Sequence, residues 1–327
     1  MTAKPAAVAW CRFQPRTAAL ATALGGQAYF LNPRLPLGLG ALPPARYAAN
    51  AIGTWRLLNR VRAPVVVAVS PPVFAPLVAW LWCRVHQSRL VIDCHTSAFA
   101  PPRWGWTRPL HRWLASRSSV AAMTFHTEDG LRQVADWRAR ALLLPDDVPA
   151  AAGAEPADRI GRPRVVVAGS LDDREPVEEA LAAADLLPDV NWRFTGETST
   201  LQRRLRTRPP GNVTFTGWLP YTSFLDELAR ADVVAAFSTD PGIMNRAAFE
   251  AIGLEQPLVL SDLPGLRSRF GDAAVFCAND PSAMATAVTE ALRRRASLRL
   301  ASRRLRQELQ QAHVEGLVRL EAAIARG

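Results

Sequence analysis

Short apolar runs rich in β-branched residues alternate with helical segments along almost the whole chain. The clearest runs, Val65–Val69 and Val233–Phe237, have the composition of strands that are buried on both faces. Helix-forming segments follow these runs, and Gly or Pro often stands where the segments end. Strands that alternate with helices in this way form parallel sheets with helices on both faces. The sequence therefore predicts an α/β protein.

The alternation forms two series, separated by a stretch of linker composition. Residues 151–161 (AAGAEPADRIG) are rich in small residues and contain no apolar run. A chain of 327 residues also suits two domains of roughly 150 residues each. We expect a first domain over 1–150, the linker over 151–161, a second domain over 162–300 and a terminal helix over 301–327.

Composition excludes several classes of protein. Hydrophobic residues make up 49% of the chain, which is too many for a disordered protein. The four cysteines are scattered and form no C-x-x-C, so we expect reduced thiols and no structural zinc site. We expect no signal peptide, and the most apolar run, 73–83, is too short to span a bilayer. These features predict a cytoplasmic protein.

The net charge of +10 is concentrated in the first half of the chain. Residues 1–150 contain 17 basic and 6 acidic residues, whereas residues 151–327 contain 22 and 23. Ten basic residues precede the first acidic residue, Asp93. A basic domain of this kind favours an anionic partner, such as lipid head groups, a pyrophosphate-bearing lipid or nucleic acid.

The stretch Phe237–Leu263 reads as strand, loop, helix, loop and strand. Its loop, Ser238–Asn245, lies where ligands bind in a parallel sheet, between the carboxyl end of a strand and the start of a helix. Glu250, one turn into that helix, could accept two hydroxyl hydrogen bonds from a ribose. The alternative is an ordinary helix in which Glu250 pairs with Arg246, four residues earlier. Spacing alone does not decide whether Glu250 binds a ribose or pairs with Arg246.

Other predicted strands also end in residues suited to a ligand. In the second series, Gly169-Ser170, Gly196 and Gly217-Trp218 follow strands, a pattern typical of a nucleotide laid across strand ends. In the first series, a strand ends in Asp93-Cys94-His95. The chain has no H-E-x-x-H or G-x-S-x-G motif, and its only lysine is Lys4, which excludes a P-loop.

Several of these segments resemble glycosyltransferase family 4, a GT-B family of group 1 glycosyltransferases. In the second half the resemblance is carried by G-S-L-x-x-x-E-P, L-L-P-D-V-x-W-x-x-T-G, N-V-T-F-T-G-W-L-P and A-x-F-E-A-I-G-x-x-x-P-L-V-L-S-D. In the first half it is carried by S-P-P-V-F-A-P-L and V-I-D-C-H-T-S-A-F. The resemblance covers about residues 60–290. It implies two Rossmann-like domains facing across a cleft, with the C-terminal helix packing back on the N-terminal domain.

The resemblance also implies roles for single residues. On the acceptor side, His95 would face the reacting sugar, with Asp93 beside it. On the donor side, Glu250 would bind the ribose of the nucleotide sugar. The other donor-binding positions that the resemblance assigns are Gly169, Ser170, Gly196, Gly217, Trp218, Leu219, Thr239, Asp240, Gly242, Ile243, Met244 and Asn245.

The chain departs from the family pattern at two places. Gly242 stands where the family has its first glutamate, and Asp240 is close to that position but off register. The arginine and lysine that usually clamp the diphosphate are absent, which leaves Arg174 or Arg246 as substitutes.

These observations favour a metal-independent, retaining glycosyltransferase of the hexosyltransferase type. It would need no cofactor, and its donor substrate would be a nucleotide-diphosphate sugar. The acceptor would be a glycan or lipid-linked saccharide of cell-envelope polysaccharide biosynthesis. The alternatives are a catalytically silent glycosyltransferase-like subunit and a nucleotide-sugar epimerase on the same fold.

The basic first half leads to a prediction about location. We expect a peripheral protein at the inner face of an anionic membrane, with no nucleic-acid partner. The run Val73–Arg84 and the loop Trp104–Trp106 would supply the apolar contacts. His111 and His126 are interpreted as structural, and His95 could instead cap a helix or bond a carbonyl.

Overall fold

The computed structural model describes residues 4–33, 43–99, 103–137, 140–149, 161–198 and 208–326. The chain divides into two compact units. Unit 1 comprises Met1–Asp147 and Gln311–Gly327, and unit 2 comprises Val148–Gln310. Of the expected linker, 151–161, only Gly161 belongs to the described residues.

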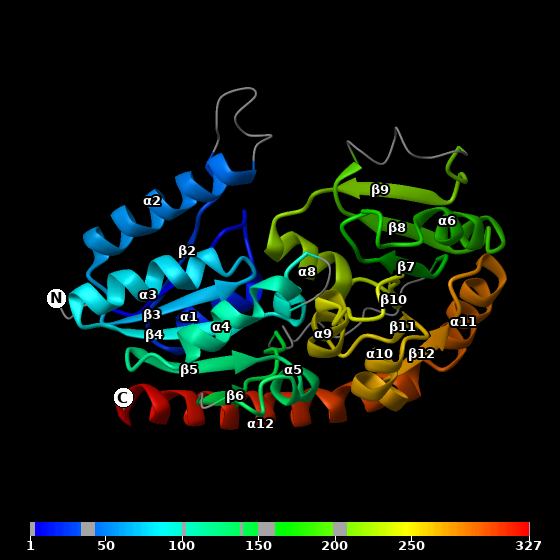
Figure 1. Ribbon diagram of the computed structural model, residues 1–327. Helices are drawn as coiled ribbons and strands as arrows, with labels where there is room; N and C mark the ends of the chain where they lie inside the picture. The colour runs from blue at the N-terminus through cyan, green and yellow to red at the C-terminus, as the bar shows by residue number, and fades with distance from the viewer. Residues whose placement is uncertain are drawn as a thin grey trace. The chain divides into compact units, whose positions relative to one another are not determined.

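Unit 1 is built on a six-stranded parallel sheet in the order β2-β1-β3-β4-β5-β6 (Figure 1). Its strands are β1 (Ala6–Ala9), β2 (Gln27–Phe30), β3 (Val65–Ser70), β4 (Arg89–Cys94), β5 (Val120–Phe125) and β6 (Ala141–Leu143). Its helices are α1 (Pro15–Ala23), α2 (Pro43–Val61), α3 (Phe74–His86), α4 (Arg108–Ala115) and α5 (Glu128–Arg132), with short 3-10 turns η2 (Thr96–Phe99) and η3 (Gly105–Thr107). The strand order reverses direction between β1 and β3, which is where ligands bind in open α/β sheets.

Both faces of this sheet are buried, as the continuous apolar strands require. Val66 and Ala68 of β3 point into a core shared with α2, α3 and α4. Val65 and Val67 point to the other face, into a core shared with α1 and with the end of α12 (Arg295–Arg326). Leu320 of α12 is fully buried there. This contact confirms that the terminal helix packs on the first domain.

Unit 2 is built on a second six-stranded parallel sheet, in the order β12-β11-β10-β7-β8-β9. Its strands are β7 (Arg164–Val167), β8 (Asn191–Thr195), β9 (Val213–Gly217), β10 (Val233–Ala236), β11 (Leu258–Ser261) and β12 (Ala274–Cys277). Its helices are α6 (Val177–Asp185), α8 (Tyr221–Ala229), α9 (Arg246–Gly253), α10 (Pro264–Phe270) and α11 (Pro281–Arg293), with the 3-10 turn η4 (Gly271–Ala273). This is the strand order of a dinucleotide-binding Rossmann sheet, with its switch point between β7 and β10.

The two parallel sheets confirm the predicted α/β fold. The helical segment that begins at Glu128 is short, because α5 ends at Arg132. The N–H groups of Val134 and Trp137 bond to the carbonyl three residues earlier, so the chain tightens into turns. The helix α10 was not predicted, because seven residues are too few to show a helical period.

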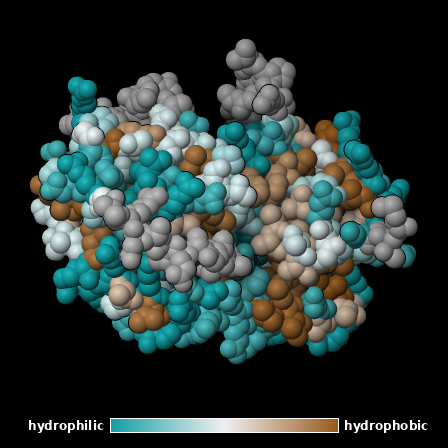
Figure 2. Space-filling view, turned by 180° about the vertical axis from the view of Figure 1, so that it is seen from behind, coloured by the Kyte–Doolittle hydropathy of each residue, from teal (hydrophilic) through white to brown (hydrophobic). Residues whose placement is uncertain are grey.

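On the face seen in Figure 2, hydrophobic residues gather toward the right of the view, and hydrophilic residues cover much of the rest. Among the described helices, none combines the length and the apolar composition that a membrane crossing requires.

Candidate functional site

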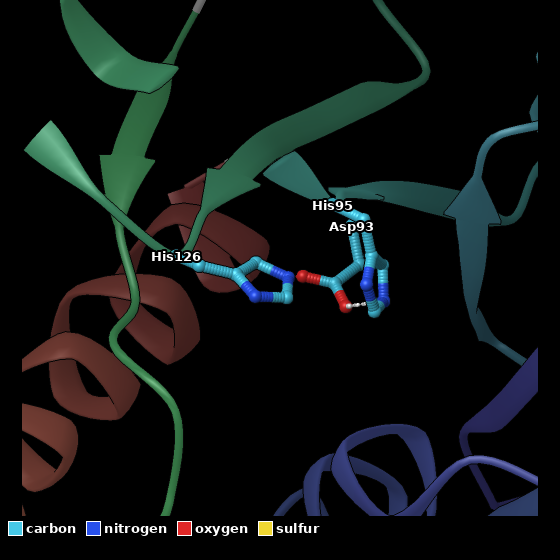
Figure 3. Close-up of side chains that lie close together, drawn as sticks. All are labelled: Asp93, His95 and His126. Carbon is cyan, nitrogen blue, oxygen red and sulfur yellow. Dashed lines mark ion pairs between the residues drawn. The ribbon is translucent and has the colours of Figure 1, made fainter. Parts of the chain in front are cut away.

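A buried charged cluster lies at the carboxyl ends of β4 and β5 in unit 1 (Figure 3). Asp93 of β4 is fully buried, and Arg16 of α1 holds both of its carboxylate oxygens. Arg16 Nε lies 3.1 Å from Asp93 Oδ2, and Nη2 lies 3.0 Å from Oδ1. Thr124 of β5 donates a third hydrogen bond to Oδ1, at 2.6 Å. Burial would raise the pKa of Asp93, but Arg16 reverses this effect and holds that pKa well below its usual range.

The same arginine joins a second carboxylate to the cluster. Arg16 Nη1 lies 3.0 Å from Asp146 Oδ1, and Nη2 donates to the carbonyl of Leu144 at 2.9 Å. Asp146 Oδ2 in turn lies 3.4 Å from Nδ1 of His126, which follows β5. Because Arg16 is buried between two carboxylates, its guanidinium is fixed, and it ties the end of β4 to the segment that follows β6.

His95 is the only one of these ionisable groups that is partly open to solvent, with 22% of its side chain exposed. Its Nε2 lies 2.8 Å from the side-chain nitrogen of Gln14 and 4.0 Å from Asp93 Oδ2. Burial and the neighbouring His126 lower the pKa of His95 to about 3. The imidazole is therefore neutral at physiological pH, and its Nε2 accepts a hydrogen bond from Gln14.

Asp93, His95 and His126 are also the residues that could hold a metal ion. Their ligand atoms all lie within 4.8 Å of one another. The buried Nε2 of His126 has no hydrogen-bond partner. Against a metal, both Asp93 oxygens already accept hydrogen bonds from the Arg16 cation, which weakens them as ligands. The arrangement fits a fixed structural carboxylate better than a metal centre.

In unit 2, the loop after β7 wraps around an internal carboxylate. The backbone N–H groups of Ser170 and Leu171 donate to Glu175, at 2.9 and 2.8 Å, and the Ser170 hydroxyl donates at 3.1 Å. A side chain at Gly169 would collide with this carboxylate, since its Cβ would lie 2.3 Å from Glu175 Oε2. The amides predicted to face a diphosphate are thus bound to an acid of the chain itself.

The predicted donor residues at the ends of β8 and β9 lie near the loop that follows β7. Gly196 contacts this loop directly. Gly196 has a φ of +121°, and a Cβ there would lie 2.7 Å from the carbonyl oxygen of Gly169, so only glycine fits. Its N–H donates to the carbonyl of Gly217 at 3.3 Å. Trp218 is 58% exposed and Leu219 is half-buried, just beyond the outer strand β9.

The loop after β10 lies across the switch point from the loop after β7. Thr239 donates from its N–H and its hydroxyl to the carbonyl of Arg174, at 2.7 and 3.0 Å. Asp240 accepts the N–H of Gly242 at 2.9 Å, and Asn245 caps α9 by accepting the N–H of Ala247. The side chains of Ile243 and Met244 pack against the core beneath the loop.

Glu250 pairs with Arg246, as the simpler of the two sequence interpretations predicts. Arg246 Nε lies 3.1 Å from Glu250 Oε1, and Glu250 is only 2% exposed. The Tyr221 hydroxyl hydrogen-bonds with both side chains, and burial raises its pKa to about 12. The other substitute cation, Arg174, pairs with Asp172 at 2.6 Å. The two arginines are therefore each bound to an acid rather than brought together.

The sequence reasoning missed Arg16, Asp146 and Glu175, and it interpreted His126 as structural. Arg16 and Asp146 lie 130 positions apart, so no spacing connects them. The sequence did contain a signal for His126 and Asp146, because His126 directly follows the apolar run of β5 and Asp146 follows that of β6. The strand-end rule used for the second series would have marked both of them.

The family model of glycosyl transferases group 1 matches residues 162–294. The sequence matches no curated protein. The match spans β7 to α11, and so includes the whole sheet of unit 2.

Solved structures resemble the chain over nearly its full length. Anabaena Alr3699/HepE in complex with UDP-glucose has a TM-score of 0.68 and 13% identity, covering 99% of this chain and 98% of that one. Sucrose-phosphate synthase from Thermosynechococcus elongatus has a TM-score of 0.66 and 16% identity, covering 99% and 97%. A glycosyltransferase from Rickettsia africae has a TM-score of 0.62 and 9% identity, covering 100% and 97%. These likenesses show the fold. The chain thus has the GT-B fold, and its residues 162–294 match the family model of the group 1 glycosyltransferases.

Proposed function

We propose that the protein is a hexosyltransferase that uses a nucleotide-diphosphate sugar as its donor. The observation that carries this proposal is the match of the whole unit 2 sheet to the group 1 glycosyltransferases. The Rossmann strand order supports it, because it brings the loops after β7 and β10 together at a nucleotide-binding switch point. Anabaena HepE, a structure of the same fold, is in complex with UDP-glucose.

On the donor side, Glu250 binds the ribose, and the 239–245 loop and the N-terminus of α9 face the diphosphate. The eight-residue helix α9 begins at the end of that loop, where the positive end of its dipole stabilises negative charge. Arg246, in the first turn of α9, adds a cation. In this proposal the helix dipole and an arginine stabilise the leaving diphosphate without a metal ion. We also propose that the transfer retains the configuration at the sugar.

On the acceptor side, neutral His95 contacts the reacting sugar, and Asp93 acts as a positioning residue. Asp93 has its oxygens bound by Arg16 and Thr124, so it holds the strand end rather than moving a proton. The acceptor is a glycan or a lipid-linked saccharide of the cell envelope. The excess of positive charge in residues 1–150 supports a peripheral position at the inner face of an anionic membrane.

A catalytically silent subunit is the second candidate, and one observation favours it. Glu175 accepts the hydrogen bonds of the backbone amides in the loop after β7. The two donor-side arginines, Arg174 and Arg246, are both paired with acids. A subunit of this kind would bind no nucleotide sugar.

A thermal-shift panel of nucleotide-diphosphate sugars distinguishes these candidates. A donor raises the Tm of an enzyme, because a ligand that binds the folded state stabilises it by mass action. We expect Glu250→Gln to weaken the calorimetric affinity for that donor by roughly 10- to 100-fold, since it removes charge-assisted hydrogen bonds.

A matched control for this variant is Glu290→Gln. Glu290 also pairs with an arginine four positions away, Arg294, at 2.8 Å on the surface near the end of α11. We expect it to leave donor affinity unchanged. The absence of any Tm shift across the panel would favour the silent subunit, and unchanged affinity in Glu250→Gln would remove Glu250 from the donor site.

A further inference from the structure

The outward side of α2, α3 and α4 carries only basic charge. These helices cover one face of the unit 1 sheet, and none of them contains an acidic residue. Residues 43–119 hold ten arginines and a single acid, Asp93, which is buried against Arg16. The exposed arginines of the three helices are Arg46, Arg56, Arg60, Arg84, Arg108 and Arg112. We call the surface that they form the arginine face.

Most of these arginines have no acidic partner. Arg112 pairs with Asp136 at 3.5 Å, and Arg108 donates to the carbonyl of Gln133. Within the described part of the chain, the other four (Arg46, Arg56, Arg60 and Arg84) form no ion pair. An exposed guanidinium without a carboxylate beside it is available to an external anion.

Apolar side chains stand between these arginines. Ile52 of α2 is 53% exposed, and Leu81 and Val85 of α3 are 48% and 62% exposed. Leu81 and Val85 are four residues apart, so they lie on the same side of their helix. Trp113 of α4 is 39% exposed and meets Trp80 of α3 edge-on, with ring centroids 4.7 Å apart. The face therefore combines cations with apolar and aromatic groups, as surfaces that lie in the head-group layer do.

Exposed apolar residues alone would not distinguish this face from others. On α12, which packs against the opposite face of the same sheet, Val314 and Val318 are also 56% and 60% exposed. Acids stand beside them, however, because Glu315 and Glu321 belong to the same helix segment. Among the described helices that carry exposed large apolar residues, α2, α3 and α4 contain arginines and no acidic residue.

We propose that the arginine face docks on an anionic lipid leaflet. The guanidinium groups meet lipid phosphates, while Leu81, Val85 and Trp113 enter the head-group layer. The proposal deepens the membrane position given in the proposed function and names the surface responsible. The docking proposal can be tested independently of donor binding, because binding to a vesicle requires no nucleotide sugar.

Vesicle sedimentation tests this directly. The full chain should pellet with vesicles of phosphatidylcholine and phosphatidylglycerol, should stay in solution with phosphatidylcholine alone, and should be released by salt. We expect the triple variant Arg56→Gln, Arg60→Gln, Arg84→Gln to bind about 100-fold more weakly, because each arginine near an anionic surface contributes about a fivefold factor. These side chains are exposed, so the variant should fold normally, which its Tm would verify.

Matched controls separate the face from the net charge. The triple variant Arg293→Gln, Arg304→Gln, Arg326→Gln removes the same charge from exposed positions elsewhere. It should bind nearly as well as the unchanged protein, and equal losses in the two variants would overturn the proposal.

A second pair of variants tests the apolar contact. Leu81→Gln with Val85→Gln should weaken vesicle binding about tenfold, whereas Val314→Gln with Val318→Gln should not. A nucleic-acid surface would behave differently. If a DNA duplex displaced the protein from vesicles while the Leu81/Val85 variant bound normally, the face would recognise nucleic acid and the membrane proposal would be wrong.

Discussion

At the scale of single residues, Asp93 and His95 are separated by one position but differ in charge state. Asp93 faces the buried guanidinium of Arg16 and stays ionised, whereas His95 loses solvent without gaining a close anionic partner and stays neutral. The folded-state pKa of each lies below its ordinary value. Their contributions to stability are therefore present at neutral pH and are lost on acidification, below about pH 6.5 for His95 and below about pH 4 for Asp93.

We predict that His95→Ala lowers kcat and leaves donor affinity unchanged, because His95 belongs to unit 1 and the donor loops belong to unit 2. Since the pKa of His95 is about 3, the pH profile of kcat should show no titration of this group between about pH 5 and 8. The measurement is kcat against pH for the unchanged protein and the variant. His86→Ala, a histidine stacked on Trp82 at the end of α3, is the control. Full turnover in His95→Ala would make His95 a structural residue.

At the scale of elements, the loop between β7 and α6 is closed by its own carboxylate. Glu175 accepts three hydrogen bonds from the loop, and burial together with the neighbouring Asp172 raises its pKa. A diphosphate approaching these amides would meet the negative charge of Glu175. The loop therefore gains rigidity while losing the ability to attract an anion.

We predict that Glu175→Gln raises donor affinity and lowers stability. Removing the negative charge should tighten the binding of a nucleotide-diphosphate sugar by roughly 3- to 10-fold, and weakening the loop's hydrogen bonds should cost about 1–3 kcal/mol. Calorimetry and denaturant unfolding measure the two effects. Asp189→Asn, which removes the same charge from an exposed position of unit 2, should change neither quantity. A loss of donor affinity in Glu175→Gln would show that the carboxylate is needed for binding.

At the scale of the whole molecule, α12 contributes to both cores. Leu298, Ala301 and Leu309 are buried in unit 2, and Leu320 and Ala323 are buried in unit 1. Near its middle the helix approaches the segment that follows β6. A Cβ at Gly316 would lie 2.9 Å from Leu144 Cδ1, and His313 Nδ1 lies 2.8 Å from the carbonyl oxygen of Pro145. This segment carries Asp146, so α12 supports the charged cluster as well as the core.

We predict that Leu320→Ala destabilises the protein by roughly 2–5 kcal/mol, because it leaves a cavity in the core between α12 and the sheet. Val318→Ala, two residues earlier and 60% exposed, should change stability by no more than about 0.5 kcal/mol. Denaturant unfolding of both variants measures the difference. Equal stability of the two variants would mean that the end of α12 adds little to unit 1.

The sequence by itself determined the elements and the fold class. Runs such as Val65–Val69 and Val233–Phe237 are short and apolar at every position, and Val65–Val69 is rich in β-branched residues, which is typical of a strand covered on both faces. Local signals also marked helix ends, and α9 ends at Gly253 as the glycine there predicts. The rule that ligands meet strand ends located Asp93, His95 and the donor loops at the carboxyl edges of their sheets, where the structure has them.

Only the tertiary structure decided which of these groups are bound to each other. Arg16 and Asp146 come together because the parallel sheet brings the start of α1 and the end of β6 to one edge, across 130 positions of sequence. The side chain of Glu175 accepts hydrogen bonds from the backbone of its own loop. The backbone conformation of the loop determines this contact, and no residue pattern reveals it. The arginine face likewise depends on three helices sharing one side of a sheet. Periodicity fixes which side of a helix is apolar, but packing alone fixes its neighbours.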